Sequence, residues 1–307
     1  ADALLRNADL AMYRAKVDGL GGHLMFEPDM HTVVSDRVLL ESRLRRAVQL
    51  EEFAVHYQPI IALDTGDVVG VEALVRWQRD TGLVPPSEFI PVAEETGLIE
   101  QIGRLVMRQA MSQTQTWHRT LGADRPLHLS INLSPRQLYQ PEIVRDVADA
   151  LEESRLDPAW LTFEITETAL LHDTTLVGHR LRELTALGVR IALDDFGTGY
   201  SSLTYLRHFP ISVLKVDKMF IDDIAAGSAD ASVGRAIIEL ARTLHLETVA
   251  EGVENARQAA ELVRLRCTMG QGFHFSPPLP ARDMSRLLRR RSSTPELTLL
   301  RSDDLAG

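Results

Sequence analysis

The stretch 161-LTFEITETALLHDTTLVGHRLRELTALGVRIALDDF-196 contains a complete strand–helix–strand unit. Short apolar runs at residues 161–166 and 189–194 have the length and side-chain content of strands. Between them, residues 174–187 have the apolar spacing of an amphipathic helix. Gly188, directly before the second run, is typical of a helix C-terminus. The stretch therefore predicts two strands connected by a helix.

The same alternation of strands and helices extends on both sides of this unit. The remaining predicted strands are residues 54–61, 68–76, 127–132, 213–216, 247–250 and 271–275. The remaining predicted helices are residues 31–50, 98–121, 142–154, 233–244 and 256–265. Eight strands that alternate with helices in this way predict an α/β fold, a (β/α)₈ TIM barrel.

The first two predicted strands differ from the others in how they are connected. The segment LDTGD at residues 63–67 is too short for a parallel crossover. We therefore expect one antiparallel strand, which makes the fold a modified barrel. A doubly wound open sheet is the alternative, but no Gly-rich phosphate-binding turn follows the first strand.

Composition narrows the class of protein. The chain has 307 residues with 45% hydrophobic and 25% charged residues, which suits one large or two ordinary globular domains. A net charge of −10 argues against a nucleic-acid polymer as partner. A single cysteine, Cys267, fits a reducing compartment. No apolar run is long enough to span a membrane, so we expect a cytoplasmic location.

Polar and charged residues recur where the predicted strands end. In chain order they are Glu72, Arg76, Asn132, Glu164, Glu167, Asp194, Asp195, Lys215, Asp217 and Glu251, with Gln271 beginning the last strand. In a barrel, such side chains meet at one rim and build the functional site. One acidic residue at a strand end is usually solvated or ion-paired, but a set drawn from six strands indicates a site.

The side-chain types in this set indicate the chemistry of the site. Carboxylate and amide oxygens are hard ligands that suit Mg²⁺ or Mn²⁺, and the histidines form no pair with the spacing that zinc prefers. With two such ions, an acidic rim becomes a phosphate site. Residues 195–197 spell DFG, but the other protein-kinase motifs are missing, which excludes a kinase.

Eight motifs together resemble a known bacterial family, the EAL domain. They are YQPI at 57–60, VEALVRW at 71–77, INLSPRQL at 131–138, FEITET at 163–168, DDFGTGYSSL at 194–203, LKVDK at 214–218, AEGVE at 250–254 and QGFHFSPPL at 271–279. The resemblance extends over residues 38–290. It implies a modified (β/α)₈ barrel that hydrolyses cyclic di-GMP to linear pGpG with two Mg²⁺ or Mn²⁺ ions.

The resemblance also implies a role for each matching residue. Metal ligands are expected at Glu72, Asn132, Glu164, Asp194, Asp195 and Glu251, with Asp195 shared with the second ion. Catalytic residues are expected at Lys215, Glu251, Asp195 and Glu72, with Lys215 orienting the attacking water. Substrate contacts are expected at Arg76, Gln58, Leu74, Gln271 and Asp217. Glu167 is expected to brace the loop after residue 195.

The beginning of the chain has a resemblance of its own. Residues 1–16, ADALLRNADLAMYRAK, and the later GGHLMFEPDM resemble the C-terminal end of a GGDEF (diguanylate cyclase) domain. We therefore expect a GGDEF remnant at 1–30, a linker or packing helix at 31–50, the barrel at 51–290 and a disordered tail at 291–307. This organisation implies upstream GGDEF and sensory domains, with a possible membrane tether in the parent protein.

Two functional alternatives remain at this point. The first is an active phosphodiesterase that works as a homodimer through its barrel, with the Gly-rich segment after Asp195 as a hinge. The second is a catalytically silent receptor that binds cyclic di-GMP and signals through the linker helix. Every expected metal-ligand and water-activating position carries the catalytic residue type, which favours the enzyme.

Overall fold

A computed structural model describes residues 30–80, 82–122, 127–170, 173–197, 208–222 and 229–291, and the single positions 8, 11, 12, 25, 26, 206, 224 and 225. The chain divides into two compact units. The first contains residues 1–52 and 77–99, and the second contains residues 53–76 and 100–307. Most of the predicted GGDEF remnant and of the predicted tail lies outside the described residues.

The second unit is a closed barrel. Its strands are β1 (Phe53–Ala62), β2 (Val68–Arg79), β4 (His128–Asn132), β5 (Leu161–Thr166), β6 (Arg190–Phe196), β7 (Val213–Val216), β8 (Glu247–Ala250) and β9 (Met269–Gly270). Neighbours pair in the order β1-β2-β4-β5-β6-β7-β8-β9, and β9 pairs with β1 again, which closes the ring. The predicted barrel is thereby confirmed, and the open sheet is excluded.

Strand β1 runs opposite to the rest of the ring. It pairs antiparallel with β9, whereas the pairs from β2 and β4 through to β8 and β9 are parallel. The short turn after β1 is closed by hydrogen bonds, from the Ala62 N–H to the Asp67 carbonyl at 2.9 Å among others. The expected antiparallel strand is therefore confirmed. A further short strand, β10 (Leu279–Pro280), pairs with β1 on its other edge.

One predicted strand is wrong. The last strand of the ring is Met269–Gly270, and residues 271–275 form a turn. The N–H groups of Phe275 and Ser276 both donate to the Gly272 carbonyl at 3.1 Å. Gly272 adopts a φ of +155°, and a Cβ atom there would lie 2.2 Å from the Val253 carbonyl oxygen. The chain therefore turns at a position that only glycine allows, although its apolar residues look like a strand.

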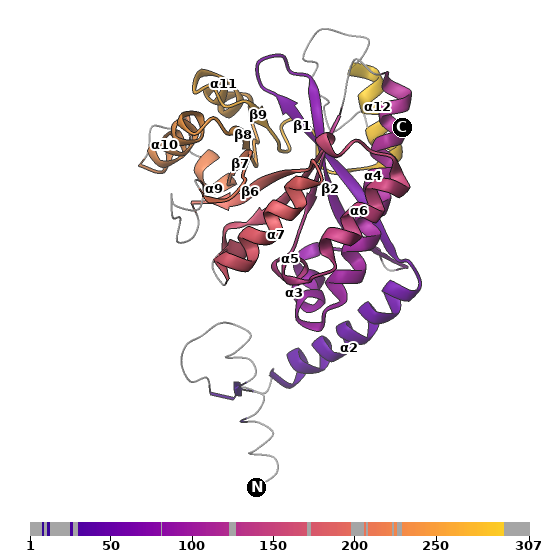
Figure 1. Ribbon diagram of the computed structural model, residues 1–307. Coiled ribbons are helices and arrows are strands. Elements are labelled where there is room, and N and C mark those ends of the chain that lie inside the picture. The colour runs from indigo at the N-terminus through magenta and orange to yellow at the C-terminus, as the bar shows by residue number, and fades with distance from the viewer. Residues whose placement is uncertain are drawn as a thin grey trace. The chain divides into compact units, whose positions relative to one another are not determined.

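Helices cover the outside of the barrel. They are α4 (Leu98–Leu121), α5 (Pro135–Tyr139), α6 (Ile143–Ser154), α7 (Thr174–Ala186), α9 (Lys218–Ile221), α10 (Ala229–Thr243), α11 (Ala256–Arg264) and α12 (Ala281–Arg291). Helix α7 packs on β6, α10 packs on β7 and β8, and α12 packs on β1 (Figure 1). No helix among the described residues combines the length and apolar character needed to cross a membrane.

The first unit has a small core of its own. It contains α2 (Met30–Gln49), the end of β2, the short β3 (Gly82–Val84) and α3 (Pro86–Thr96). The Trp77 indole donates to Glu52 at 3.0 Å and meets the Phe89 ring edge-on at 5.9 Å between centroids. Helix α3 begins with a proline at its first turn and ends at Gly97, whose φ is +81°.

Side chains that point into the barrel change character along its axis. Asn132 and Glu164 lie at or near the C-terminal ends of their strands, and Glu72 lies near the middle of the longer β2. Gly70, Ser130 and Thr162 lie two residues earlier on the same strand faces. On other strands, the earlier positions hold an apolar cluster of Ile60, Ala192, Val213 and Val249. The barrel therefore has a polar C-terminal end, an apolar middle on one side, and small residues on the other.

Candidate active site

The predicted polar side chains meet around the ammonium group of Lys215. Its Nζ atom lies 2.5 Å from Glu164 Oε2, 2.5 Å from Glu251 Oε1, 3.4 Å from Asp194 Oδ2 and 3.8 Å from Glu72 Oε2. Each residue comes from a different strand or from the residue just after one. The Lys215 side chain is only 2% exposed. One buried cation therefore holds four carboxylates together.

Electrostatics at this cluster are dominated by burial and by crowded negative charge. Burial alone would lower the pKa of Lys215, but the surrounding carboxylates raise that pKa well above its ordinary value. Burial, together with repulsion from Glu72, raises the pKa of Glu164 well above the usual range. Burial also raises the pKa of Glu251 to about 8, and Lys215 only partly offsets it. The cluster therefore carries more negative charge than one lysine compensates.

Glu72 is the best hydrogen-bonded carboxylate of the group. Asn132 Nδ2 donates to its Oε1 at 2.6 Å, and Gln271 Nε2 donates to its Oε2 at 2.6 Å. Burial raises the pKa of Glu72, but the charge of Lys215 and these hydrogen bonds outweigh burial and lower it. Glu72 is therefore held ionised, with both oxygens in fixed positions.

A chain of amides supports Glu72 from β1. Gln271 Nε2 also donates to Gln58 Oε1 at 2.9 Å, and Gln58 Nε2 donates to the Ser276 carbonyl at 3.1 Å. Gln58 and Gln271 are both buried. The amide chain fixes Gln271 and leaves its buried Oε1 atom without a hydrogen-bond partner among the described residues.

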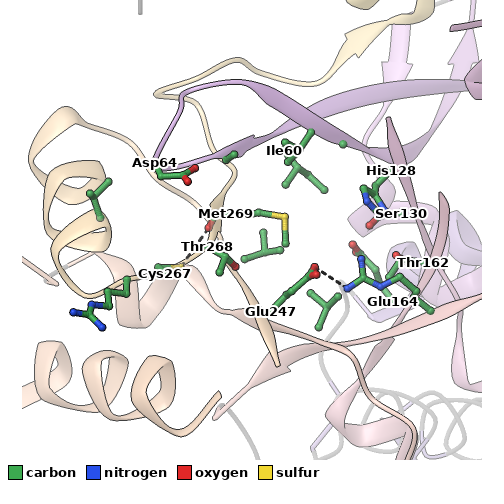
Figure 2. Close-up of a pocket in the computed structure, with 18 residues that line it drawn as sticks. Ile60, Asp64, His128, Ser130, Thr162, Glu164, Glu247, Cys267, Thr268 and Met269 are labelled. Carbon is green, nitrogen blue, oxygen red and sulfur yellow. Dashed lines mark hydrogen bonds and ion pairs between the residues drawn. The ribbon is translucent and has the colours of Figure 1, made fainter. Parts of the chain in front are cut away.

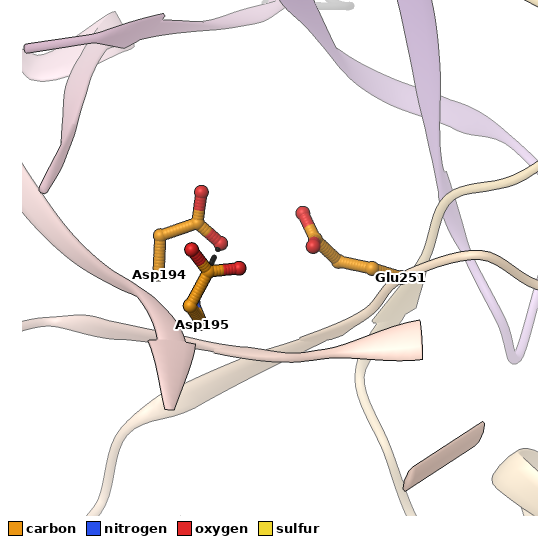
Figure 3. Close-up of side chains that lie close together, drawn as sticks. All are labelled: Asp194, Asp195 and Glu251. Atoms are coloured by element: carbon orange, nitrogen blue, oxygen red, sulfur yellow. Dashed lines mark hydrogen bonds between the residues drawn. The ribbon is translucent and has the colours of Figure 1, made fainter. Parts of the chain in front are cut away.

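Three carboxylates form a second group beside Lys215. Asp194, Asp195 and Glu251 each offer an oxygen, and these oxygens lie within 4.8 Å of one another (Figure 3). The register of β6 against β7 shifts between Leu193 and Phe196, and Asp195 adopts a φ of +55°. Without this irregularity, adjacent residues of a strand would point to opposite faces. The bulge is therefore what allows Asp194 and Asp195 to face the same space.

The donor set fits divalent cations that prefer oxygen ligands. Burial and the nearby charges of Asp194 and Asp217 raise the pKa of Asp195. Such crowding of like charges is unfavourable until a cation neutralises it. The surrounding donors are carboxylate and amide oxygens, and these are the ligands that Mg²⁺ and Mn²⁺ prefer.

The other predicted site residues occupy the same end of the barrel. Arg76 lies near the end of β2, and burial lowers its pKa while the nearby charge of Glu72 raises it. Leu74, which lies between Glu72 and Arg76 in the sequence, is half-buried. Asp217 caps α9, accepting from the Met219 N–H at 2.8 Å. The Gly197 N–H donates to Glu167 at 3.3 Å. The roles assigned to these residues stay predictions.

One contributor to the site was not expected from the sequence. The carbonyl of Ser276, a buried residue, anchors Gln58 and through it the amide chain. Because Gln58 contacts the backbone carbonyl, this hydrogen bond could not be predicted from the side-chain type at position 276. Gln271 was expected on a strand, and it lies instead just after β9, at the start of the turn.

Comparison with known proteins places this geometry in a family. Residues 41–278 match the EAL domain. The bifunctional diguanylate cyclase/cyclic di-GMP phosphodiesterase MucR of Pseudomonas aeruginosa is 42% identical over 282 residues, which cover 92% of this chain and 41% of MucR. The cyclic di-GMP phosphodiesterase PdeR of Escherichia coli is 39% identical over 289 residues, which cover 94% of this chain and 43% of PdeR. The chain thus spans less than half the length of either relative.

A solved structure agrees with the sequence comparison. The PaMucR phosphodiesterase in complex with c-di-GMP superposes with a TM-score of 0.76 at 42% identity, covering 80% of this chain and 99% of that chain. Its fold is therefore shared by the described barrel. Together with the match over residues 41–278, this similarity shows that the chain belongs to the EAL domain family.

Proposed function

We propose that this chain hydrolyses one phosphodiester bond of cyclic di-GMP and releases linear pGpG. The observation that carries the proposal is the cluster around Lys215, where Glu72, Glu164, Asp194 and Glu251 all lie within 4 Å of its ammonium group. Two of the relatives, MucR and PdeR, are named cyclic di-GMP phosphodiesterases. The matched regions cover 41% of MucR and 43% of PdeR.

Two divalent cations, Mg²⁺ or Mn²⁺, complete the proposed site. Glu72, Asn132, Glu164 and Asp194 would hold one ion, Asp195 would contribute to both, and Glu251 would lie beside them. Bound ions of this kind neutralise the phosphate and lower the pKa of a coordinated water. The crowding of Asp194, Asp195 and Glu251 within 4.8 Å supports this assignment.

The chain's own residues would position the water and receive its proton. Lys215 and Glu251 lie 2.5 Å apart, so one water can contact both. In the proposed reaction the water oxygen forms a bond to phosphorus as the water loses a proton, and the bond from phosphorus to the 3′ oxygen breaks. The 3′ oxygen takes up a proton from solvent water and leaves as a hydroxyl. Glu251 takes up the proton lost by the water, and Lys215 orients the water by donating to it.

Substrate contacts are proposed for a group of residues at the same end of the barrel. Arg76 would hold a phosphate, since its charged side chain lies near the end of β2 on the strand that carries Glu72. The other members of the group are Gln58, Leu74, Gln271 and Asp217. Glu167 would brace the segment after Asp195 through its contact with the Gly197 N–H.

The wider organisation is also proposed. Residues 1–30 would be the end of a GGDEF domain, since the match with the bifunctional MucR covers 92% of this chain and so extends beyond residues 41–278. We propose that sensory domains precede this GGDEF domain in the parent protein. We also propose that the chain forms a homodimer through its barrel and that residues 1–307 lie in the cytoplasm.

Turnover of cyclic di-GMP tests the proposal directly. The chain is incubated with cyclic di-GMP and Mg²⁺ or Mn²⁺, and pGpG is separated by chromatography. We expect product with either ion, none with EDTA and almost none with Ca²⁺, whose larger coordination sphere is less rigid. Glu72→Ala should abolish turnover, whereas Glu152→Ala, an exposed glutamate on α6, should not.

A receptor function is the outcome that would replace this proposal. Tight binding of cyclic di-GMP without any pGpG, under every ion tested, would indicate a binding module. Turnover that persists in Glu72→Ala would instead contradict the assigned role of this carboxylate. A monomer with full specific activity would overturn the proposed dependence on dimerisation.

A further inference from the structure

A cavity lies toward the end of the barrel opposite the Lys215 cluster. It has a volume of about 550 Å³, within the range of small-molecule sites (Figure 2). Its outer wall comes from the beginnings of parallel strands, at Gly70, His128, Arg190, Val213 and Glu247, and from the end of the antiparallel β1. Its innermost residue toward the proposed active site is Glu164.

Small side chains explain why this end of the barrel is hollow. Gly70, Ser130 and Thr162 line the cavity, each two residues before a member of the polar cluster. Barrels usually fill such inward positions with bulky branched residues. Here Ile60, Val213 and Val249 fill only the other wall. The cavity therefore exists because β2, β4 and β5 carry small residues at this level of the barrel, where large residues would fill it.

Both acidic and basic side chains line the cavity. Arg190 pairs with Glu247 at 2.7 Å, and Glu164 contacts the ammonium group of Lys215 at 2.5 Å. Asp64 and Arg266, also among the lining residues, have opposite charges. Most of the remaining wall is apolar, with Val69 and Met269 packed on the Ile60 cluster. A cavity with a mainly apolar wall and no excess of basic residues offers little to attract an anion, and it favours a neutral molecule.

One polar atom in the wall has nothing to bind in the described part of the chain. Nδ1 of His128, which lines the cavity, is buried and lacks a hydrogen-bond partner. Burial and the nearby charge of Arg190 lower the pKa of this histidine, which keeps its ring neutral. Buried polar atoms are almost always satisfied, so an unpaired one in the wall of a cavity points to a missing partner.

We propose that this cavity, lined by Gly70, Ser130, Thr162, Val249 and His128, binds a neutral, mostly apolar small molecule. The ligand carries one hydrogen-bonding group, and rotation of the His128 ring on binding would bring its buried, unpaired Nδ1 atom to that group. The site lies at the N-terminal end of the strands, and Glu164 alone of the four carboxylates that face Lys215 lines it. It does not depend on the proposed phosphodiesterase activity.

A fluorescent probe tests the site with the whole chain. N-phenyl-1-naphthylamine is neutral, aromatic and carries one N–H group, and its emission rises in apolar surroundings. We expect saturable binding at one site per chain. Tryptophan replacements at two lining positions, Val69→Trp and Val263→Trp, should weaken binding by at least about tenfold because they occupy the cavity or its mouth.

Val233→Trp is the matched control. Val233 on α10 is 44% exposed and Val263 on α11 is 46% exposed, but only Val263 lines the cavity. The control should therefore bind the probe like the unmodified chain. If Val69→Trp fails to fold, as judged by circular dichroism, comparison of Val263→Trp with Val233→Trp still tests whether the probe binds in the cavity.

Two results would overturn the proposal. One is no saturable binding, or binding that both lining variants leave unchanged. The other is displacement of the probe by cyclic di-GMP in the presence of Ca²⁺, which would assign the probe to the Lys215 end of the barrel. Saturable binding that resists cyclic di-GMP and is lost in Val263→Trp supports the site.

Discussion

Nζ of Lys215 and Oε1 of Glu251 lie 2.5 Å apart in the interior of the barrel, and this ammonium group also contacts Glu164 at 2.5 Å. Lys215 is thus the cation that partly compensates the charge of the carboxylate cluster when no other cation is bound. Divalent ions at the same carboxylates would share this task. The stability of the protein should therefore depend on Lys215 and on metal together.

Lys215→Met should destabilise the chain strongly in EDTA and less strongly with Mn²⁺. Removal of a buried cation leaves carboxylates without compensation, which costs about 3–5 kcal/mol. Differential scanning fluorimetry with and without metal measures this effect. Lys218→Met is the control, since Lys218 is 48% exposed and forms surface ion pairs, and it should change the melting temperature little. An equal loss in EDTA and in Mn²⁺ would contradict the coupling.

Gln58→Leu should weaken both stability and catalysis. Gln58 accepts from Gln271 and donates to the Ser276 carbonyl, so its loss leaves two buried polar groups unsatisfied. We expect a loss of about 1–2 kcal/mol in unfolding free energy and a decrease of about tenfold in kcat. Urea titration and pGpG production measure the two effects. Gln101→Leu, at an exposed position of α4, should change neither, and unchanged kcat in Gln58→Leu would rule out the supporting role.

His128→Phe should make stability less dependent on pH. Burial and Arg190 lower the pKa of His128 below the ordinary value of 6.5, so the folded state disfavours its protonated form. The stability that follows from this is present above pH 6.5 and is lost as the pH falls toward the folded-state pKa. Phenylalanine keeps the ring contact with Trp160, whose centroid lies at 4.8 Å, and cannot be protonated.

Urea unfolding on both sides of pH 6.5 measures this difference. The unmodified chain should lose more unfolding free energy than His128→Phe as the pH falls. His179→Phe, at an exposed position of α7, is the control and should follow the unmodified chain. Parallel pH profiles for all three proteins would show that His128 stays protonatable at its ordinary pKa.

Gly272→Ala should be far more damaging than Gly122→Ala. Both glycines have positive φ angles, +155° and +91°. A Cβ atom at Gly272 would lie 2.2 Å from the Val253 carbonyl oxygen, whereas a Cβ atom at Gly122 would have no atom of the described residues within 4 Å. We expect a loss of about 3 kcal/mol or more at position 272 and about 1–2 kcal/mol at position 122. Similar losses in thermal unfolding would refute a close approach at Gly272.

Most of the barrel was predictable because its strands and helices have strong local patterns. Predicted strands 161–166, 213–216 and 247–250 have the bounds of β5, β7 and β8, and helix 98–121 has those of α4. The short helices were missed. Helix α5 begins with a capping box between Ser134 and Gln137, and this sequence signal could have revealed it.

The site was predictable in its membership but not in its geometry. Strand periodicity indicates that Glu72 and Arg76 share a face, but it cannot place Asp194 beside Asp195, because adjacent residues normally point to opposite faces. Only the bulge in β6 and the φ of +55° at Asp195 bring them together. The turn at Gly272 was missed for a similar reason, since a tertiary contact with Val253 decides it.

The reversed direction of β1 offers a place for protein engineering. Because β1 runs opposite to β2, the turn at residues 63–67 lies at the N-terminal end of the barrel, and its Asp64 lines the cavity there. New termini or an inserted reporter domain at this turn would therefore leave the carboxylates at the other end of the strands undisturbed. Such an insertion would also carry the reporter to the mouth of the cavity, where occupancy could be read as a change in fluorescence.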